Sequence, residues 1–183
     1  MHKALSLLFV SFIFSTQSFA QDCAGFPIVE GFTSEIEKSC LGLVATENEV
    51  PWTMPRQILF IDNTTVVISD LGGWGSKTNG KVFELNLKTM ESEEIYSGGF
   101  FTHGLGLDSE KRLLVGDANK IIRLDDGFQT VVLEGLPSEG SHPITHFIVL
   151  PNNDLVVNVG APSDNCKEEM GGGTHLSLIH ISE

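Results

Sequence analysis

PRQILFIDNTTVVISD (Pro55–Asp70) consists of two short apolar runs separated by a polar cluster, and the same layout returns twice further along the chain. The two repeats are HGLGLDSEKRLLVGD (His103–Asp117) and ITHFIVLPNNDLVVNVG (Ile144–Gly160). A short apolar run, a turn and a β-branched run are typical of a β-hairpin. The sequence therefore predicts three hairpins built to one plan.

The spacing between these hairpins predicts the fold. Asp70 and Asp117 lie 47 residues apart, and Leu113 and Leu155 lie 42 residues apart, within the roughly 40–50 expected of propeller blades. Further strands are expected between the hairpins, at Gly80–Thr89, Glu94–Tyr96, Lys120–Leu124 and Gln129–Leu133, the last two joined by an Asp-Asp-Gly turn. We therefore expect an all-β chain that holds about three four-stranded blades of a β-propeller.

The first twenty residues have the features of a secretory signal peptide. A basic start at Lys3 precedes an apolar run over residues 4–14, and Ser18-Phe19-Ala20 forms a small-x-small cleavage pattern. The run is shorter than the roughly 20 residues that span a bilayer. We expect an exported protein, periplasmic or extracellular, without membrane insertion.

The charge of the chain argues against nucleic acid as a partner. Its formal net charge is −13, and removal of Lys3 with the signal peptide makes it −14. Such acidity repels phosphate backbones. The charge does not identify a ligand.

All three cysteines lie in the exported part, where disulfides are permitted. Cys23 and Cys40 are the expected pair, within an N-terminal extension over residues 21–50. Closing a loop of this size contributes about 3 kcal/mol in the chain-entropy model. Cys166 is left as a free thiol, an intermolecular partner, or one half of a bridge whose other half the sequence does not contain.

The last residues differ in character from the rest. We expect the propeller part to cover residues 51–173 and a non-native tail to cover 174–183. LSLIHISE (Leu176–Glu183) resembles the conceptual translation of a transposon-end adapter used in sequencing libraries. On that interpretation the natural protein continues past Gly173, and His175 and His180 are not metal ligands. A genuine short tail is the alternative.

A resemblance to a known family rests on SHPITHFIVLPNNDLVVNVGAPSDNC (Ser141–Cys166), in which a histidine, a strand, a turn and a second strand lead into Gly-Ala-Pro-Ser-Asp-Asn-Cys. This order resembles the pyrroloquinoline quinone (PQQ)-dependent glucose/sorbosone dehydrogenases. These are six-bladed propellers that oxidise sugars outside the cytoplasm. The resemblance covers Met54–Cys166 and includes Thr102–Leu105 less strongly. It implies an N-terminal part of such an enzyme.

The resemblance also implies roles for individual residues. His142 matches the catalytic histidine that takes the hydroxyl proton while hydride passes to the quinone, a suitable task for an imidazole with an ordinary pKa near 6.5. His103, Ser163 and Asp164 are the expected cofactor-binding residues. The family usually has arginine where this chain has His146. PQQ, Ca²⁺, a sugar or aldehyde substrate and an external electron acceptor are implied, with most calcium ligands outside this sequence.

Other polar residues have simpler interpretations. Asp70 and Asp117 end strands and are interpreted as turn formers, with no metal role. Trp74 could stack on a sugar ring, but capping a blade is the simpler reading. His146 alternates into a strand and is expected to pack against its neighbours.

Two other function classes stay open at the level of sequence. A calcium-dependent propeller lactonase would need carboxylates that converge on the channel. A non-catalytic, ligand-binding propeller is also consistent with the fold, since one fold serves many functions.

Overall fold

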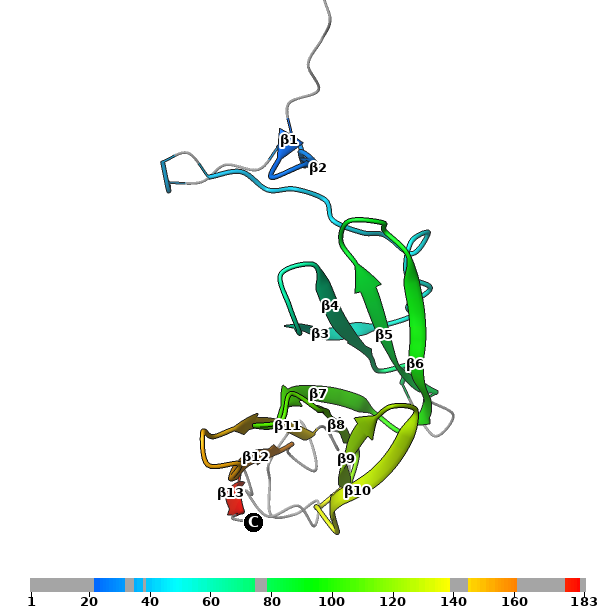
Figure 1. Cartoon of the computed structure of the whole chain (residues 1–183), viewed down its shortest axis with the longest axis vertical. Coiled ribbons are helices and arrows are strands. Elements are labelled where there is room, and N and C mark those ends of the chain that lie inside the picture. Colours follow the sequence, from blue (N-terminus) through cyan, green and yellow to red (C-terminus); the bar gives the residue numbers. More distant parts are fainter. Residues whose placement is uncertain are drawn as a thin grey trace, which may run out of the picture. The chain divides into compact units, whose positions relative to one another are not determined.

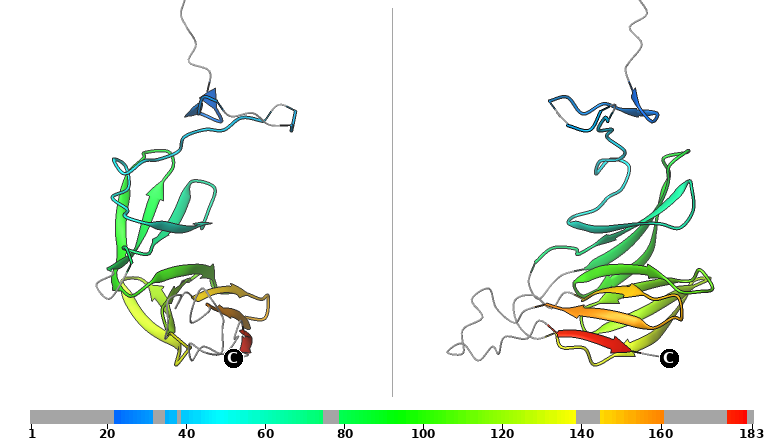
Figure 2. Two further views of the ribbon diagram at one scale, coloured as in Figure 1. Left: turned by 180° about the vertical axis from the view of Figure 1, so that it is seen from behind. Right: turned by 90° about the vertical axis from the view of Figure 1, so that its left-hand side faces the viewer.

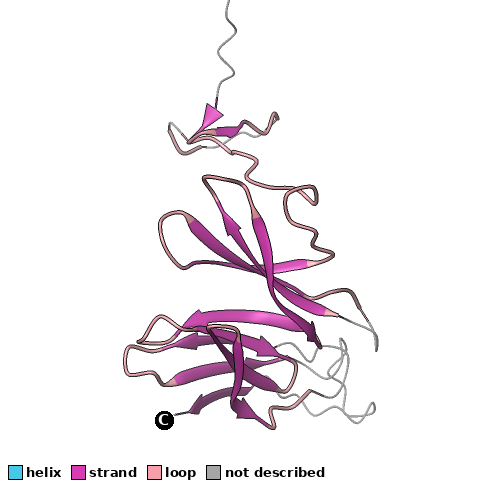
Figure 3. Cartoon of the chain, turned by 45° about the vertical axis from the view of Figure 1, so that its right-hand side comes forward, coloured by secondary structure: helices cyan, strands magenta, loops and turns pink. Residues whose placement is uncertain are grey.

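The computed structural model describes residues 22–31, 35–37, 39–74, 79–138, 145–160 and 177–181. Every regular element in these ranges is a β-strand, which confirms the all-β prediction (Figure 3). The predicted signal peptide at residues 1–20 lies outside them. No helix of the described part is long and apolar enough to cross a membrane. The chain divides into two compact units, Met1–Val44 and Ala45–Glu183.

The first unit is a small disulfide-linked segment. Strands β1 (Asp22–Cys23) and β2 (Phe26–Pro27) form a two-stranded antiparallel ribbon. Cys23 and Cys40 are joined by a disulfide with their Cα atoms 5.7 Å apart. An isolated bridge between Ile28 and Gly42 adds a second tie. The disulfide therefore links the ribbon to a segment that follows it by 17 residues.

Two four-stranded antiparallel sheets form the main part of the second unit (Figure 1). The first sheet contains β3 (Pro55–Phe60), β4 (Thr65–Asp70), β5 (Gly80–Asn86) and β6 (Ser92–Gly99). The second contains β7 (Thr102–Leu107), β8 (Leu113–Asp117), β9 (Lys120–Asp125) and β10 (Phe128–Glu134). In both sheets the strands lie in sequence order, as in a propeller blade.

The third sheet contains β11 (Thr145–Val149), β12 (Leu155–Val159) and β13 (Ser177–Ile181), again in sequence order. Strand β13 falls in the predicted non-native tail and pairs with β12 from Ser177 opposite Val159 to Ile181 opposite Leu155. Pairing needs only a strand-forming pattern, so it leaves the origin of the tail a prediction. All three predicted hairpins are present as β3–β4, β7–β8 and β11–β12.

Local turn chemistry explains where the strands end. Between β3 and β4, a side-chain oxygen of Asp62 accepts a hydrogen bond from the Thr64 N–H at 2.6 Å. Between β9 and β10, Asp126 and Gly127 have φ angles of +45° and +81°. Two successive positive φ angles are typical of a type I′ hairpin turn, which the Asp-Gly pair favours. The predicted Asp-Asp-Gly turn is therefore confirmed.

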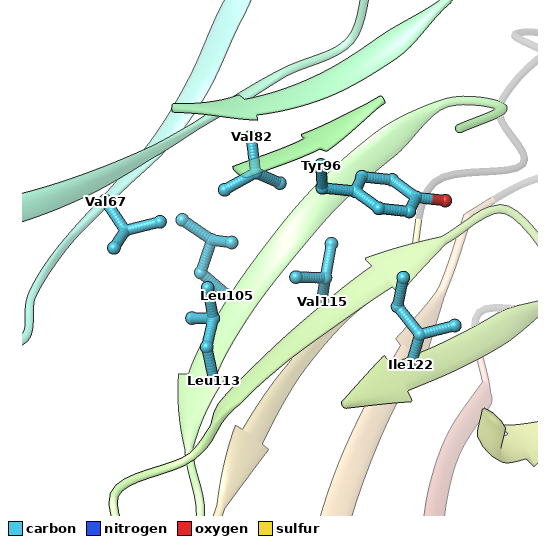
Figure 4. Packing of buried hydrophobic residues seen from close by; sticks show 7 residues of the cluster. All are labelled: Val67, Val82, Tyr96, Leu105, Leu113, Val115 and Ile122. Carbon is cyan, nitrogen blue, oxygen red and sulfur yellow. The ribbon is translucent and has the colours of Figure 1, made fainter. Parts of the chain in front are cut away.

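The sheets pack face to face through apolar side chains. Val67, Val82 and Tyr96 of the first sheet meet Leu105, Leu113, Val115 and Ile122 of the second, as Figure 4 shows. A second cluster joins the second sheet to the third, where Leu114 and Ile121 pack with Phe147, Leu155 and Val157. Gly106 permits this contact, because a Cβ at that position would lie only 2.8 Å from the Phe147 ring. Each sheet therefore buries one face against the next, as the blades of a propeller do.

The segment before the first sheet covers part of its outer face. Val50 is fully buried and packs with Val66, Ile68 and Phe83, and Trp52 packs against the same cluster. A hydrogen bond from the Ser92 hydroxyl to the Glu49 carbonyl, 2.6 Å long, holds the segment in place. The second unit therefore begins at Ala45, before the start at residue 51 expected from the sequence.

Candidate functional site

Three side chains with catalytic or binding chemistry lie on the first strands of successive sheets. Arg56 lies on β3, His103 on β7 and His146 on β11. These three strands neighbour one another, with β7 beside both β3 and β11 (Figure 2). Residues 47 and 43 positions apart in the sequence are thereby brought to one region.

The contacts within this region are specific. The imidazole rings of His103 and His146 meet edge to face, with their centroids 5.9 Å apart. The Arg56 guanidinium lies 5.5 Å from the centre of the Trp74 ring, within cation–π range. Arg56 also acts electrostatically on His103. We call Arg56, Trp74, His103 and His146 together the Arg–His surface.

Buried aspartates fix the chain where these strands begin. Asp70, fully buried at the end of β4, accepts hydrogen bonds from the backbone N–H groups of Thr53 at 2.7 Å and Met54 at 2.6 Å. These amides lead directly into β3, which carries Arg56. The carboxylate therefore positions the strand entry, and the prediction that Asp70 is only a turn former understates its role.

Asp117 occupies the equivalent place at the end of β8. Its carboxylate accepts hydrogen bonds from the Phe100 N–H at 2.5 Å and from the Tyr96 hydroxyl at 2.9 Å. The Thr102 hydroxyl lies 3.4 Å away as a further donor. Burial raises the pKa of Tyr96, and the nearby charge of Asp117 adds to the effect, so the phenol keeps its proton and remains a donor. Asp117 thus anchors the chain ahead of His103.

Side chains of the first sheet hold the backbone on both sides of Gly104. The Gln57 amide forms two 3.0 Å hydrogen bonds to Leu105, donating to its carbonyl and accepting from its N–H. The Ser69 hydroxyl, which is fully buried, donates to the His103 carbonyl at 2.6 Å. The position of His103 is therefore set by cross-sheet hydrogen bonds as well as by its own strand.

The protonation state of His103 follows from its surroundings. Burial lowers the pKa of His103 from 6.5 to about 4, and the positive charges of His146 and Arg56 add to the effect. Its Nδ1 atom is buried and makes no hydrogen bond. At neutral pH the ring is uncharged and has an unused nitrogen, so it can accept or donate one hydrogen bond to a ligand.

This shifted pKa predicts a pH-dependent stability. The folded-state value lies below the unfolded one, so the unfolded chain takes up a proton as pH falls from about 6.5 towards 4. We expect the free energy of unfolding to decrease across that window. The His103→Asn variant should show a smaller decrease between about pH 6.5 and 5, a range above the ordinary carboxylate pKa values, in urea titrations at several pH values. Equal pH dependence in both proteins would contradict the assignment.

The other predicted site residues cannot be placed. His142, Ser163 and Asp164 lie outside the described residues, and so does Cys166. In the sequence, His142 precedes the first residue of β11 by three positions. Their roles therefore stay predictions. Among the sequence-predicted cofactor residues, the structure places His103 alone.

The structure adds two residues to the predicted site. Arg56 was not selected from the sequence, although it precedes His103 by 47 residues, the spacing that also separates Asp70 from Asp117. That shared spacing was the available signal. His146 was expected to pack among its neighbours, but its side chain is exposed, and its ring contacts His103.

Within the described ranges, no group of three or more His, Cys, Asp or Glu side chains is arranged to hold a metal ion. Asp70 and Asp117 are buried, and their oxygens are occupied by the donors described above. In this part of the chain, the exposed chemistry is cationic, aromatic and imidazole in character rather than acidic.

Comparisons with known proteins give limited information. No family model and no curated protein matches the chain. Among solved structures, it is similar to an X-ray structure of a protein provisionally named a gluconolactonase, with a TM-score of 0.43 and 17% sequence identity. The match covers 58% of this chain and 42% of that one. The class of protein that the fold and the surface define is an all-β protein of repeated, propeller-like antiparallel sheets.

Proposed function

We propose that the protein is an exported PQQ-dependent sugar dehydrogenase that oxidises an aldose or a sorbosone-type sugar. Two features support the proposal: the resemblance of Ser141–Cys166 to that family, and the Arg–His surface. The second is the observation that carries it, because an exposed guanidinium, an uncharged buried imidazole and an indole ring come together on neighbouring strands.

The residues present fit such a cofactor. PQQ is a planar, aromatic molecule with several carboxylates. A guanidinium forms strong paired hydrogen bonds with a carboxylate, and an indole ring stacks on an aromatic face. The unpartnered Nδ1 of His103 offers a further hydrogen bond. Arg56 and His103 would therefore bind the cofactor's polar groups, and Trp74 would lie against its ring or against the sugar.

The protein's contribution to chemistry would be position, charge and a base. PQQ, when bound, supplies the electron-accepting quinone. His142 is proposed to take the hydroxyl proton of the sugar, and Ser163 and Asp164 to complete the cofactor site. Ca²⁺ and an external electron acceptor belong to the same proposal. The positive charge of Arg56 would also favour an anionic ligand over a cationic one.

A calcium-dependent lactonase is the main alternative. The solved structure with the provisional lactonase name belongs to a chain of that activity class by its name alone. A lactonase site needs free carboxylates around its metal, whereas Asp70 and Asp117 are committed to backbone N–H groups. A binding propeller without catalysis is the remaining alternative, and lactone hydrolysis and PQQ-dependent turnover distinguish the three.

A binding experiment tests the cofactor assignment. The exported protein is titrated with PQQ, and quenching of tryptophan fluorescence reports binding. Arg56→Ala should weaken the affinity by about tenfold or more, since a hydrogen bond to a charged group contributes about 1.5–3 kcal/mol. Lys88→Ala, which removes an exposed lysine from a turn, is the matched control and should bind like the wild type. Equal affinities for the Arg56 variant and the wild type would refute the assignment.

A further inference from the structure

The three sheets present equivalent apolar positions on one face. Phe60 pairs with Val66, Leu107 with Leu113, and Val149 with Leu155, so the first two strands of each sheet can be aligned residue by residue. The aligned set on this face, which we call the near face, contains Ile58, Phe60, Val66 and Ile68 in the first sheet, Leu105, Leu107, Leu113 and Val115 in the second, and Phe147, Val149, Leu155 and Val157 in the third.

The near face is buried in the second and third sheets by the sheet that precedes each. Leu105 and Phe147, at equivalent positions on the first strands, are each 2% exposed. In the first sheet, Val66 and Ile68 are covered by Val50. Their neighbours on β3 are not: Ile58 is 64% exposed and Phe60 is 62% exposed. We call Ile58 and Phe60 the open strip.

The opposite face of the third sheet has a matching exposed residue. Leu59 on β3 faces the second sheet and packs against its core. The equivalent residue on β11 is Ile148, which is 54% exposed. Contacts of the Leu59 kind therefore have an unfilled counterpart at Ile148, just as contacts of the Leu105 kind have one at Ile58. The molecule makes the same sheet-to-sheet interface twice and carries one open half of it at each end of the series.

We propose that a second copy of this chain supplies the missing halves. Ile148 of one copy packs against Ile58 and Phe60 of the other, which continues the stacking already seen between the first and second sheets and between the second and third. The contact is head to tail, since the two surfaces differ. Such heterologous contacts form a ring if the rotation closes and a chain of copies if it does not. This inference is independent of the proposed function.

Sedimentation velocity and light scattering on the chain without its signal peptide test the inference. Across about 1 to 100 μM, a range that covers weak to moderate affinities, the wild type should associate with increasing concentration. Ile58→Lys and Ile148→Lys should each be monomeric, because every copy then lacks one half of the contact. Hydrogen exchange in β3 of the wild type should slow as concentration rises, which needs no variant.

Mixing the two variants distinguishes a head-to-tail contact from other modes. The Ile58→Lys copy keeps Ile148, and the Ile148→Lys copy keeps Ile58, so an equimolar mixture should form dimers. Phe128→Lys, at a residue 76% exposed on β10, is the control and should associate like the wild type. Circular dichroism must show that all variants are folded. A monomeric wild type at every concentration, or a mixture that stays monomeric, overturns the proposal.

Discussion

Replacing Asp117 with alanine is expected to lower the free energy of unfolding by about 4 kcal/mol, as measured by urea titration. The carboxylate is 3% exposed, and its two oxygens satisfy donors from Tyr96, Phe100 and Thr102. Without it, the phenol and the amide are left in a dry environment without partners. Each such group costs about 1–3 kcal/mol.

Two further variants test the origin of this loss. Asp117→Asn keeps one carbonyl oxygen as an acceptor and should lose about half as much stability. Asp125→Ala removes an exposed aspartate from the same sheet and should change stability by less than about 0.5 kcal/mol. If Asp117→Ala behaves like Asp125→Ala, the buried network does not stabilise the fold as described.

The His142→Ala variant is expected to lower the turnover number for sugar oxidation by about 10²- to 10⁴-fold, the usual contribution of a general base. The reason is chemical: removal of the imidazole leaves water as the only proton acceptor for the sugar hydroxyl. The affinity for PQQ should change little, because the base acts on the substrate. Steady-state kinetics with an artificial electron acceptor and a PQQ titration on the same preparation give both quantities.

A matched histidine substitution controls for this effect. His175→Ala lies in the predicted non-native tail and should leave the turnover number unchanged. In the variant at position 142, a turnover number within about twofold of the wild type would rule out its role as the base. A loss of PQQ affinity as large as the loss of turnover would instead assign His142 to cofactor binding.

The strand pairs could be predicted from the sequence because their causes are local. Alternating apolar residues define β3 and β4, and Asp62 supplies the turn between them. Repetition of that pattern at 47 and 42 residues predicted the sheet order without any knowledge of contacts. The Asp-Gly turn between β9 and β10 is similarly local, since its positive φ angles are a property of two residues.

The functional contacts could not be predicted in the same way, because they depend on how the sheets pack. Gln57 reaches a residue 48 positions away, and His103 meets a ring 43 positions away. Strand-end aspartates usually form turns, and nothing in the local sequence of Asp70 shows that it binds amides 16 and 17 residues earlier. Such contacts require the register and the face of each sheet to be known.

The most direct test of the account is PQQ-dependent sugar oxidation by the protein expressed from its complete reading frame, which sequencing of the source DNA across Gly173 establishes. The exported protein is assayed with an aldose panel, an artificial electron acceptor and Ca²⁺, with and without PQQ, beside a parallel assay of lactone hydrolysis. The account predicts sugar oxidation that requires PQQ and no lactone hydrolysis. Lactone hydrolysis without PQQ-dependent oxidation, or the absence of both activities, would contradict it.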